Sequence, residues 1–224
     1  MAHLLIAFKR KDGLSLADFS RHWREVHAPL AKRMPSLRGY VQNHSSTVVS
    51  RSQAYDGVVE IWMDSEAAIT AAFQSKEYRE GAYADEPNFA DVKNVVRLVT
   101  ADHVLRGGEE PNSPEPRVKR LSFIKRKPDW DQDEFFRYWK DVHGPLALAL
   151  PGLQRYVQCH ALPSAYERGE PQYDGVAELW FETLGDLNFA LASAEYKEHT
   201  QPDGAKFADP ASTFTLITEE YRIV

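Results

Sequence analysis

Short apolar runs alternate with amphipathic segments along the first hundred residues of the chain. Residues 3–9, 37–45, 55–63 and 94–105 are apolar runs of strand length. Between the first two runs the spacing predicts a helix, whose apolar face carries Leu16, Phe19, Trp23, Val26, His27 and Leu30. Residues 65–80 predict a second helix, and an irregular stretch rich in Tyr, Asp, Glu and Pro leads to the last strand. The predicted order is strand, helix, strand, strand, helix, strand.

The same pattern occurs a second time in the chain. Residues 3–44 match residues 119–160 at a constant offset of 116 without a gap, with 18 identities in 42 pairs. After His44 the offset becomes 118, and YDGVVEIW (55–62) matches YDGVAELW (173–180). Chance similarity does not keep register in this way, so we interpret the chain as a tandem duplication.

The duplicated order predicts an α+β fold made of two ferredoxin-like βαββαβ modules. We expect module 1 at 1–105, a linker at 106–117 that is rich in Pro, Glu and Gly, and module 2 at 118–224. The helices of such a module cover one face of its sheet and leave the other face bare. We therefore expect the two sheets to pack face to face, as an intramolecular dimeric α/β barrel.

The composition is that of a globular protein and not of a nucleic-acid binder. Hydrophobic residues make up 43% and charged residues 27% of the chain, and the net charge is −6. An acidic chain lacks the basic surface that phosphate contacts need. The single cysteine, Cys159, excludes an internal disulfide and is expected to be a buried thiol. We find no signal peptide or membrane-spanning run and expect a cytoplasmic protein with no membrane partner.

The first predicted helix contains the sequence FSRHWREVHAPLA, which returns as FFRYWKDVHGPLA in the second copy. Pro29 removes a backbone donor, so we expect the helix to end or kink near His27 and Pro29 to start a short second segment. At a helix C-terminus the dipole favours the imidazolium form of His27, whereas burial opposes it. His27 and its counterpart His143 are therefore candidates for an acid or base, the alternative being a core histidine bonded to free carbonyls.

Polar residues alternate along the second strand. Tyr40, Gln42 and His44 share one face, as do Tyr156, Gln158 and His160 in the second copy. They either line a pocket or bond across the seam between sheets.

The third strand carries Glu60 and Trp62 on one face, and Glu178 and Trp180 in the second copy. Glu60 is expected to pair with Arg97 or another base on an adjacent strand, or to act as an acid/base partner of His27. The dipeptide before it, Asp56-Gly57, is typical of a turn. His27, His44 and Glu60 lack the spacing of a metal site, so we predict no metal. The chain also lacks GxGxxG, P-loop, GxSxG and CxxC motifs.

These blocks together resemble a known family. FxxxWxxxHxPLA, PxLxxYVQ and YDGxxExW, each present twice, are similar to the EthD-domain family of the dimeric α/β-barrel superfamily. The resemblance implies a role in the metabolism of small, often aromatic or xenobiotic molecules. Relatives in the superfamily include cofactor-free monooxygenases, isomerases, decarboxylases, polyketide cyclases and haem proteins. It also implies a pocket between the sheet and the helices of a module, towards which Trp23 and His27 would point.

The resulting hypothesis is an enzyme that uses no cofactor and acts on a hydrophobic small molecule. The predicted catalytic residues are His27, His143, Glu60 and Glu178. The predicted substrate-binding residues are Trp23, Tyr40, Gln42, His44, Trp62, Trp139, Tyr156, Gln158, His160 and Trp180. The alternatives are a non-catalytic small-molecule binder and a haem protein with His27 or His143 as axial ligand. We expect an intramolecular pseudo-dimer, able to form further homo-oligomers.

The fused copies differ at several positions, which allows their pockets to diverge. His3 and His22 of the first copy correspond to Lys119 and Tyr138 of the second.

Overall fold

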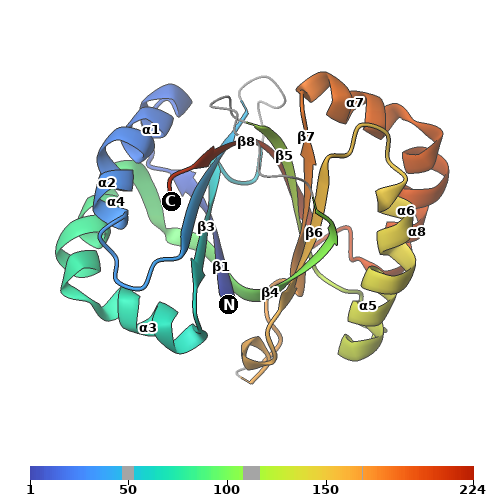
Figure 1. Ribbon diagram of the computed structural model, residues 1–224, viewed down its shortest axis with the longest axis horizontal. Coiled ribbons are helices and arrows are strands. Elements are labelled where there is room, and N and C mark those ends of the chain that lie inside the picture. The colour runs from blue at the N-terminus through green and yellow to red at the C-terminus, as the bar shows by residue number, and fades with distance from the viewer. Residues whose placement is uncertain (47–52, 108–116, 168) are drawn as a thin grey trace. The chain divides into compact units, whose positions relative to one another are not determined.

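The computed structural model describes residues 1–46, 53–107, 117–167 and 169–224 (Figure 1). Most of the predicted linker, residues 108–116, lies outside the described residues. The described elements of the first copy are β1 (Ala2–Arg10), α1 (Leu16–His22), the π-helical turn η1 (Trp23–His27), α2 (Ala28–Ala31), β2 (Gly39–Ser45), β3 (Gly57–Met63), α3 (Glu66–Gln74), the π-helical turn η2 (Tyr78–Ala82), α4 (Tyr83–Phe89) and β4 (Ala90–Arg106).

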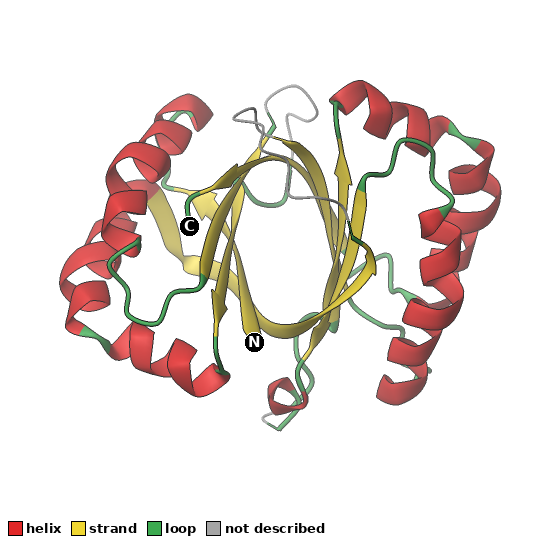
Figure 2. Cartoon of the chain, viewed as in Figure 1, coloured by secondary structure: helices red, strands yellow, loops and turns green. Residues whose placement is uncertain are grey.

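The second copy follows the same order. Its described elements are β5 (Arg117–Ile124), α5 (Gln132–Tyr138), the π-helical turn η3 (Trp139–His143), α6 (Gly144–Leu148), β6 (Arg155–Ala161), the 3-10 turn η4 (Pro163–Ala165), β7 (Gly175–Phe181), α7 (Leu184–Ala192), the π-helical turn η5 (Glu195–Thr200), α8 (Gln201–Phe207) and β8 (Phe214–Arg222). The predicted mixed α+β class is therefore confirmed (Figure 2). Hydrogen bonds join the eight described strands in the closed order β1-β3-β2-β8-β5-β7-β6-β4.

The chain divides into two compact units whose limits differ from the ends of the repeats. Unit 1 contains Met1–Ala101 together with Thr218–Val224, and unit 2 contains Asp102–Ile217. The last residues of the second copy belong to unit 1 because β8 pairs with β2, from Val41 opposite Arg222 to Ser45 opposite Thr218.

Each unit has its own hydrophobic core between a sheet and its helices. In unit 1, β1 pairs with β3 and β4, and β3 pairs with β2, all antiparallel. Helix residues Phe19 and Trp23 pack there against Phe8 and Ile61 of the strands. In unit 2, Phe135, Trp139, Leu179 and Phe207 belong to the corresponding core. The helix thus buries the apolar face seen in the sequence, except at Val26, which was expected on that face and is exposed.

The helix changes at His27, in line with the predicted end or kink and short second segment: the π-helical turn ends at His27, and α2 begins at Ala28 with Pro29 in its first turn. The helical backbone continues through Pro29, because it widens into the π-helical turn Trp23–His27, where the N–H of Ala28 donates to the carbonyl of Trp23. Proline in a regular helix clashes with the carbonyl four residues earlier. A wider turn relieves that clash, and the second copy repeats the solution with Gly144 donating to Trp139.

Residues 81–93 are likewise not irregular, as the sequence analysis expected. The helical turn η2 and α4 continue to Phe89, and β4 begins at Ala90. Gly81 and Pro87 both lie within this helical segment. Pro87 is only two residues from the end of α4, where few backbone bonds remain to be lost.

Gly57 has a different role from the predicted turn. It is the first residue of β3, and a Cβ atom there would lie 2.5 Å from Cζ3 of Trp23. Gly175 is in the same situation, 2.6 Å from Trp139. Glycine is therefore needed because the indole ring lies directly on the start of the strand.

Among the described residues, no helix combines the length and the apolar character required to cross a membrane.

Candidate functional site

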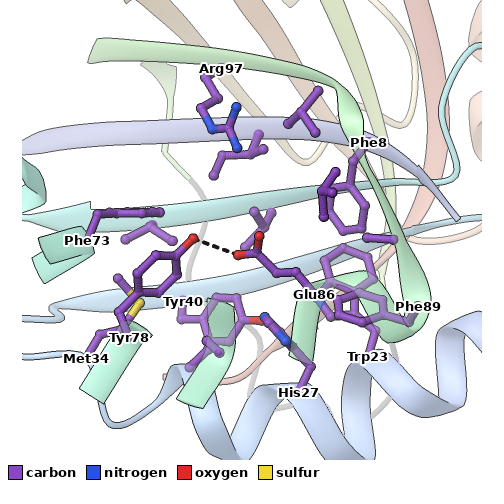
Figure 3. Close-up of a pocket in the computed structure, with 18 residues that line it drawn as sticks. Phe8, Trp23, His27, Met34, Tyr40, Phe73, Tyr78, Glu86, Phe89 and Arg97 are labelled. Atoms are coloured by element: carbon purple, nitrogen blue, oxygen red, sulfur yellow. Dashed lines mark hydrogen bonds between the residues drawn. The ribbon is translucent and has the colours of Figure 1, made fainter. Parts of the chain in front are cut away.

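A cavity lies between the sheet and the helices of unit 1, on the side towards which Trp23 and His27 point (Figure 3). The space open to the centre of a water molecule is about 60 Å³. Most of its lining is apolar, with Phe73 and Phe89 from helices and Ile61 from β3. The polar residues of the lining are His27, Tyr40, Tyr78, Glu86 and Arg97, which also carry its chemistry.

His27 is held in the cavity wall by a buried carboxylate. Its Nδ1 lies 3.1 Å from Oδ2 of Asp85, and Nε2 of His22 lies 2.9 Å from Oδ1 of the same residue. Asn88 donates to Asp85 as well. A carboxylate only accepts hydrogen bonds, so Nδ1 of His27 carries the proton and the neutral ring has its lone pair on Nε2. Within the described residues, Nε2 of His27 has no hydrogen-bond partner.

The environment sets the protonation of this pair. Burial lowers the pKa of His27, and the hydrogen bond to Asp85 and its negative charge only partly offset that effect. Burial raises the pKa of Asp85, but hydrogen bonds from Asn88, His22 and His27 outweigh it, and the pKa falls below its usual range. Near neutral pH the pair therefore consists of a neutral imidazole and an ionised carboxylate, the arrangement of a general base.

A second acid lies beside the pair. The hydroxyl of Tyr78 donates to Oε1 of Glu86 at 2.7 Å (Figure 3). Burial raises the pKa of Glu86, and the hydrogen bond from Tyr78 and the charge of Arg97 oppose this. A carboxyl with a raised pKa is able to take up or release a proton closer to neutral pH than an exposed one.

The row Tyr40, Gln42 and His44 forms a hydrogen-bonded chain along β2. The amide of Gln42 donates to the hydroxyl of Tyr40 and to the carbonyl of Trp23, and its Oε1 lies 3.0 Å from Nε2 of His44. Tyr156, Gln158 and His160 repeat these contacts in unit 2. Burial lowers the pKa of both His44 and His160 to about 3, so both are neutral. In unit 1, Tyr40 is the member of the row that lines the cavity.

Glu60 lies on the other face of the sheet. Its neighbours Val59 and Ile61 line the cavity, so Glu60 points away from it. Oε2 of Glu60 lies 3.3 Å from Nε2 of His3, and His3 stacks on Trp62 with ring centres 4.1 Å apart. The base on the adjacent strand is thus His3 and not Arg97, and the carboxylate that contacts His27 is Asp85.

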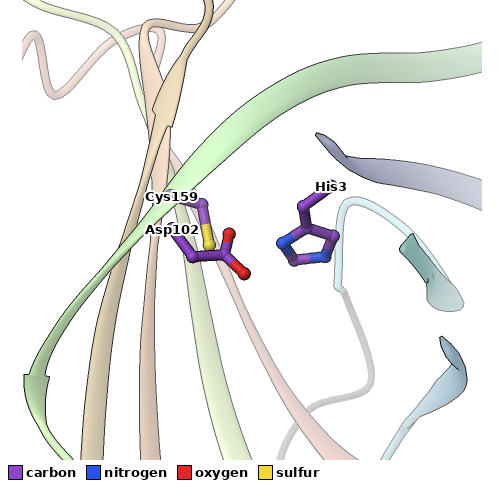
Figure 4. Close-up of side chains that lie close together, drawn as sticks. All are labelled: His3, Asp102 and Cys159. Carbon is purple, nitrogen blue, oxygen red and sulfur yellow. The ribbon is translucent and has the colours of Figure 1, made fainter. Parts of the chain in front are cut away.

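In unit 2 a lysine–glutamate ion pair takes the place of the His3–Glu60 contact. Lys119, which replaces His3, lies 3.2 Å from Glu178 and over the ring of Trp180. Cys159 of β6 is buried, as expected, and lies near Asp102 (Figure 4).

The histidine–aspartate pair is also present in unit 2. Nδ1 of His143 lies 3.0 Å from Asp203, which accepts a hydrogen bond from Tyr138 where unit 1 has His22. Burial lowers the pKa of His143. The neighbouring acid is missing, however, because Gly204 occupies the place of Glu86.

Four site residues were not predicted from the sequence: Asp85, Glu86, Tyr78 and Arg97. Asp85 and Asp203 stand at the offset of 118 that relates the ends of the two copies, so the repeat contained a signal for them. They were overlooked because the segment was expected to be irregular. His27, His44 and Glu60, for which no metal was predicted, contact three different partners: Asp85, Ser20 and His3.

Comparison with known proteins identifies the domain type. The family model described as the EthD domain matches residues 11–93 and 127–211, once in each copy. No curated protein matches the chain significantly.

Several solved structures share the fold at low sequence identity. An anthrone oxidase-like protein is 10% identical with a TM-score of 0.71, covering 99% of this chain and 93% of its own. A proposed monooxygenase from Fusobacterium nucleatum is 8% identical with a TM-score of 0.62, covering 98% and 91%. Chlorite dismutase from Candidatus Nitrospira defluvii is 12% identical with a TM-score of 0.56, covering 99% and 91%. At these identities the similarity concerns the fold.

Proposed function

The chain belongs to the EthD domain family, and we propose that it is a cofactor-independent enzyme that acts on a small, mainly apolar molecule in the cavity of unit 1. The observation that carries the proposal is His27, whose Nδ1 is fixed by Asp85 while its Nε2 keeps a lone pair at the cavity wall. A histidine base that a carboxylate orients at the wall of an apolar pocket is a usual arrangement for proton abstraction.

The steps follow from the geometry. Nε2 of His27 removes a proton from a carbon or a phenolic oxygen of the substrate. The imidazolium that forms is stabilised by Asp85, which is already ionised. The resulting substrate anion is an electron-rich species that reprotonation converts to an isomer, or that dioxygen oxidises. Glu86, with Tyr78, lies in the same cavity and is our candidate for returning a proton.

The lining limits the substrate class. Aromatic rings from Phe73, Phe89 and Trp23 favour a flat, aromatic or polyketide-like molecule. The similar folds of an anthrone oxidase-like protein and a proposed monooxygenase support an oxidation among the reactions available to such an anion. We therefore place oxygenation first and isomerisation or decarboxylation second.

The test is a comparison of matched variants on one substrate panel. Phenols, naphthols and anthrones are incubated with the protein under air, with dioxygen uptake and product absorbance as readouts. We expect His27→Gln to lower kcat at least 100-fold, the usual contribution of a general base, and Asp85→Asn to lower it less. His143→Gln in unit 2 is the matched control and should retain activity. Full activity of His27→Gln on a turned-over substrate would refute the assignment.

Haem binding is a second candidate, favoured by the same geometry. His27 would hold the haem iron through Nε2, since a metal-binding histidine commonly donates its other ring N–H to a carboxylate, as His27 donates Nδ1–H to Asp85. Titration with haemin distinguishes the two. A Soret band that is lost in His27→Gln supports haem binding, and a spectrum of free haemin excludes it.

A further inference from the structure

Unit 2 carries an arginine on the sheet face that its helices cover. Arg120 lies on β5, and two residues away on either side Val118 and Ser122 point to the same face. Val118 packs against the core of unit 2, as does Leu179, which is paired with Arg120 across β5 and β7. Tyr156 pairs with Leu179 from the other side, so Arg120, Leu179 and Tyr156 form one row across the sheet.

The corresponding row in unit 1 lines the cavity. There Leu4 pairs with Ile61, which pairs with Tyr40, and Ile61 and Tyr40 both belong to the cavity lining. Leu4 is 4% exposed and is part of the hydrophobic core. Unit 2 thus has a guanidinium where unit 1 has a core leucine.

Arg120 is partly buried, and a counter-charge would stabilise its guanidinium there, because that group stays protonated at any pH a protein tolerates. Among the described residues, Arg120 makes no ion pair or hydrogen bond. Burial lowers its pKa, and the groups that act on it electrostatically are Tyr196 and Tyr156, neither of which is a carboxylate. Its positive charge in turn acts on His143 and lowers the pKa of that ring.

The two units also differ in charge at the helix beside this row, which is α4 in unit 1 and α8 in unit 2. In unit 1 the cavity arginine, Arg97, acts on the carboxylate of Glu86. In unit 2 the position of Glu86 is Gly204, and a Cβ atom there would lie 3.5 Å from Cε1 of His143. The side chain that supplies negative charge in unit 1 is therefore absent beside His143.

We propose that unit 2 binds an organic carboxylate, with Arg120 pairing with the carboxylate group and the apolar body of the ligand lying beside Tyr156 and His143. The planar guanidinium matches a carboxylate through two parallel hydrogen bonds, which a neutral amide of the same shape cannot replace. The inference concerns unit 2 and does not depend on the function proposed for the cavity of unit 1.

The experiment measures binding of acetate, benzoate and 1-naphthoate to the full chain by calorimetry, with benzamide as the neutral isostere. We expect saturable binding that strengthens from acetate to 1-naphthoate, and at least tenfold weaker binding of benzamide than of benzoate. Arg120→Leu, which restores the residue of the first copy, should weaken benzoate binding about tenfold or more. Gly204→Glu should weaken it as well, because the new carboxylate occupies Arg120.

Two controls separate this site from non-specific effects. Arg137→Leu removes one positive charge from an exposed position of α5 and should leave benzoate affinity unchanged. Circular dichroism and thermal unfolding check that each variant is folded, and Arg120→Lys, which keeps the charge, should bind with intermediate affinity. Absence of saturable binding by all three carboxylates, or equal affinity in wild type and a folded Arg120→Leu, would overturn the proposal. His27→Gln should bind benzoate normally in either case, which keeps the test distinct from that of the unit 1 cavity.

Discussion

Two buried histidines of unit 1 illustrate how the contact partners of a ring influence its protonation. His27 contacts the carboxylate of Asp85, so a proton taken up on its ring meets a negative charge. His44 contacts the hydroxyl of Ser20 and the amide oxygen of Gln42, which offer it no charge. Both rings are similarly buried and burial lowers the pKa of both, but only at His27 does a carboxylate offset part of that effect. The sequence indicated both as candidates and contained no means to separate them, because the separation depends on residues far away in the chain.

We predict a stability change with pH that originates at His44 and His160. Their pKa in the folded protein is about 3, against an ordinary value near 6.5, so the unfolded chain binds more protons between these limits. Above pH 6.5 both histidines are neutral in the folded and the unfolded chain, and they do not reduce the free energy of unfolding. As the pH falls from 6.5 towards 3, the free energy of unfolding should decrease by up to about 1.4 kcal/mol per pH unit for each histidine.

Urea unfolding between pH 4 and 8 provides the measurement. In the double variant His44→Gln, His160→Gln this part of the slope should disappear, leaving the part due to carboxylates and to His27 and His143, whose pKa burial also lowers. An unchanged slope in the double variant would show that the two rings do not cause it.

At the scale of elements, periodicity predicted the strands and the first part of each helix well, because apolar spacing directly reflects burial. It failed at the π-helical turns, since a change from four- to five-residue hydrogen bonding has no signature in the apolar pattern. The sequence predicted the end or kink near His27 but not the wider turn that precedes it, and residues 81–93 were expected to be irregular. The failure at residues 81–93 also hid Asp85 and Glu86, which are two of the four site residues that the sequence did not predict.

The close approach of Trp23 to the start of β3 leads to a second prediction. Gly57→Ala inserts a methyl group 2.5 Å from the indole ring, so the ring or the strand must move. We expect a loss of about 1–3 kcal/mol in the free energy of unfolding, as for other overpacked cores. Gly13→Ala is a useful contrast, because no atom lies within 4 Å of the added Cβ there and only its positive φ of 87° opposes the change. The measurements are tryptophan fluorescence and the free energy of unfolding. If both were the same in Gly57→Ala and the wild type, the close packing of Trp23 on the start of β3 would be contradicted.

At the scale of the whole molecule, the duplication predicted the order of elements but not the limits of the units. Sequence similarity follows the copies, whereas compactness follows hydrogen bonds, and β8 bonds to β2 of the other copy. Val224 also exchanges backbone hydrogen bonds with Tyr40, next to the cavity. Pairing between residues so distant in sequence leaves no local pattern to detect.

A truncation tests this arrangement. A chain that ends at residue 217 loses the residues that pair with β2, and we expect unit 1 to become less stable than unit 2. Hydrogen exchange should then show weakened protection in β2 and β3 while β6 and β7 stay protected. Val224→Ala, which keeps the backbone bonds, is the control. Uniform protection of the truncated chain would contradict the described pairing.

The placement of Thr218–Val224 in unit 1 has a consequence for biosynthesis. The ribosome delivers residues 1–101 first, then all of unit 2, and only at the end the segment that completes unit 1. At translation rates of about 5–20 residues per second, the nascent first unit waits on the order of ten seconds for its last strand. During that time the edge of β2 has no partner from β8, and the unit that was begun first is finished last.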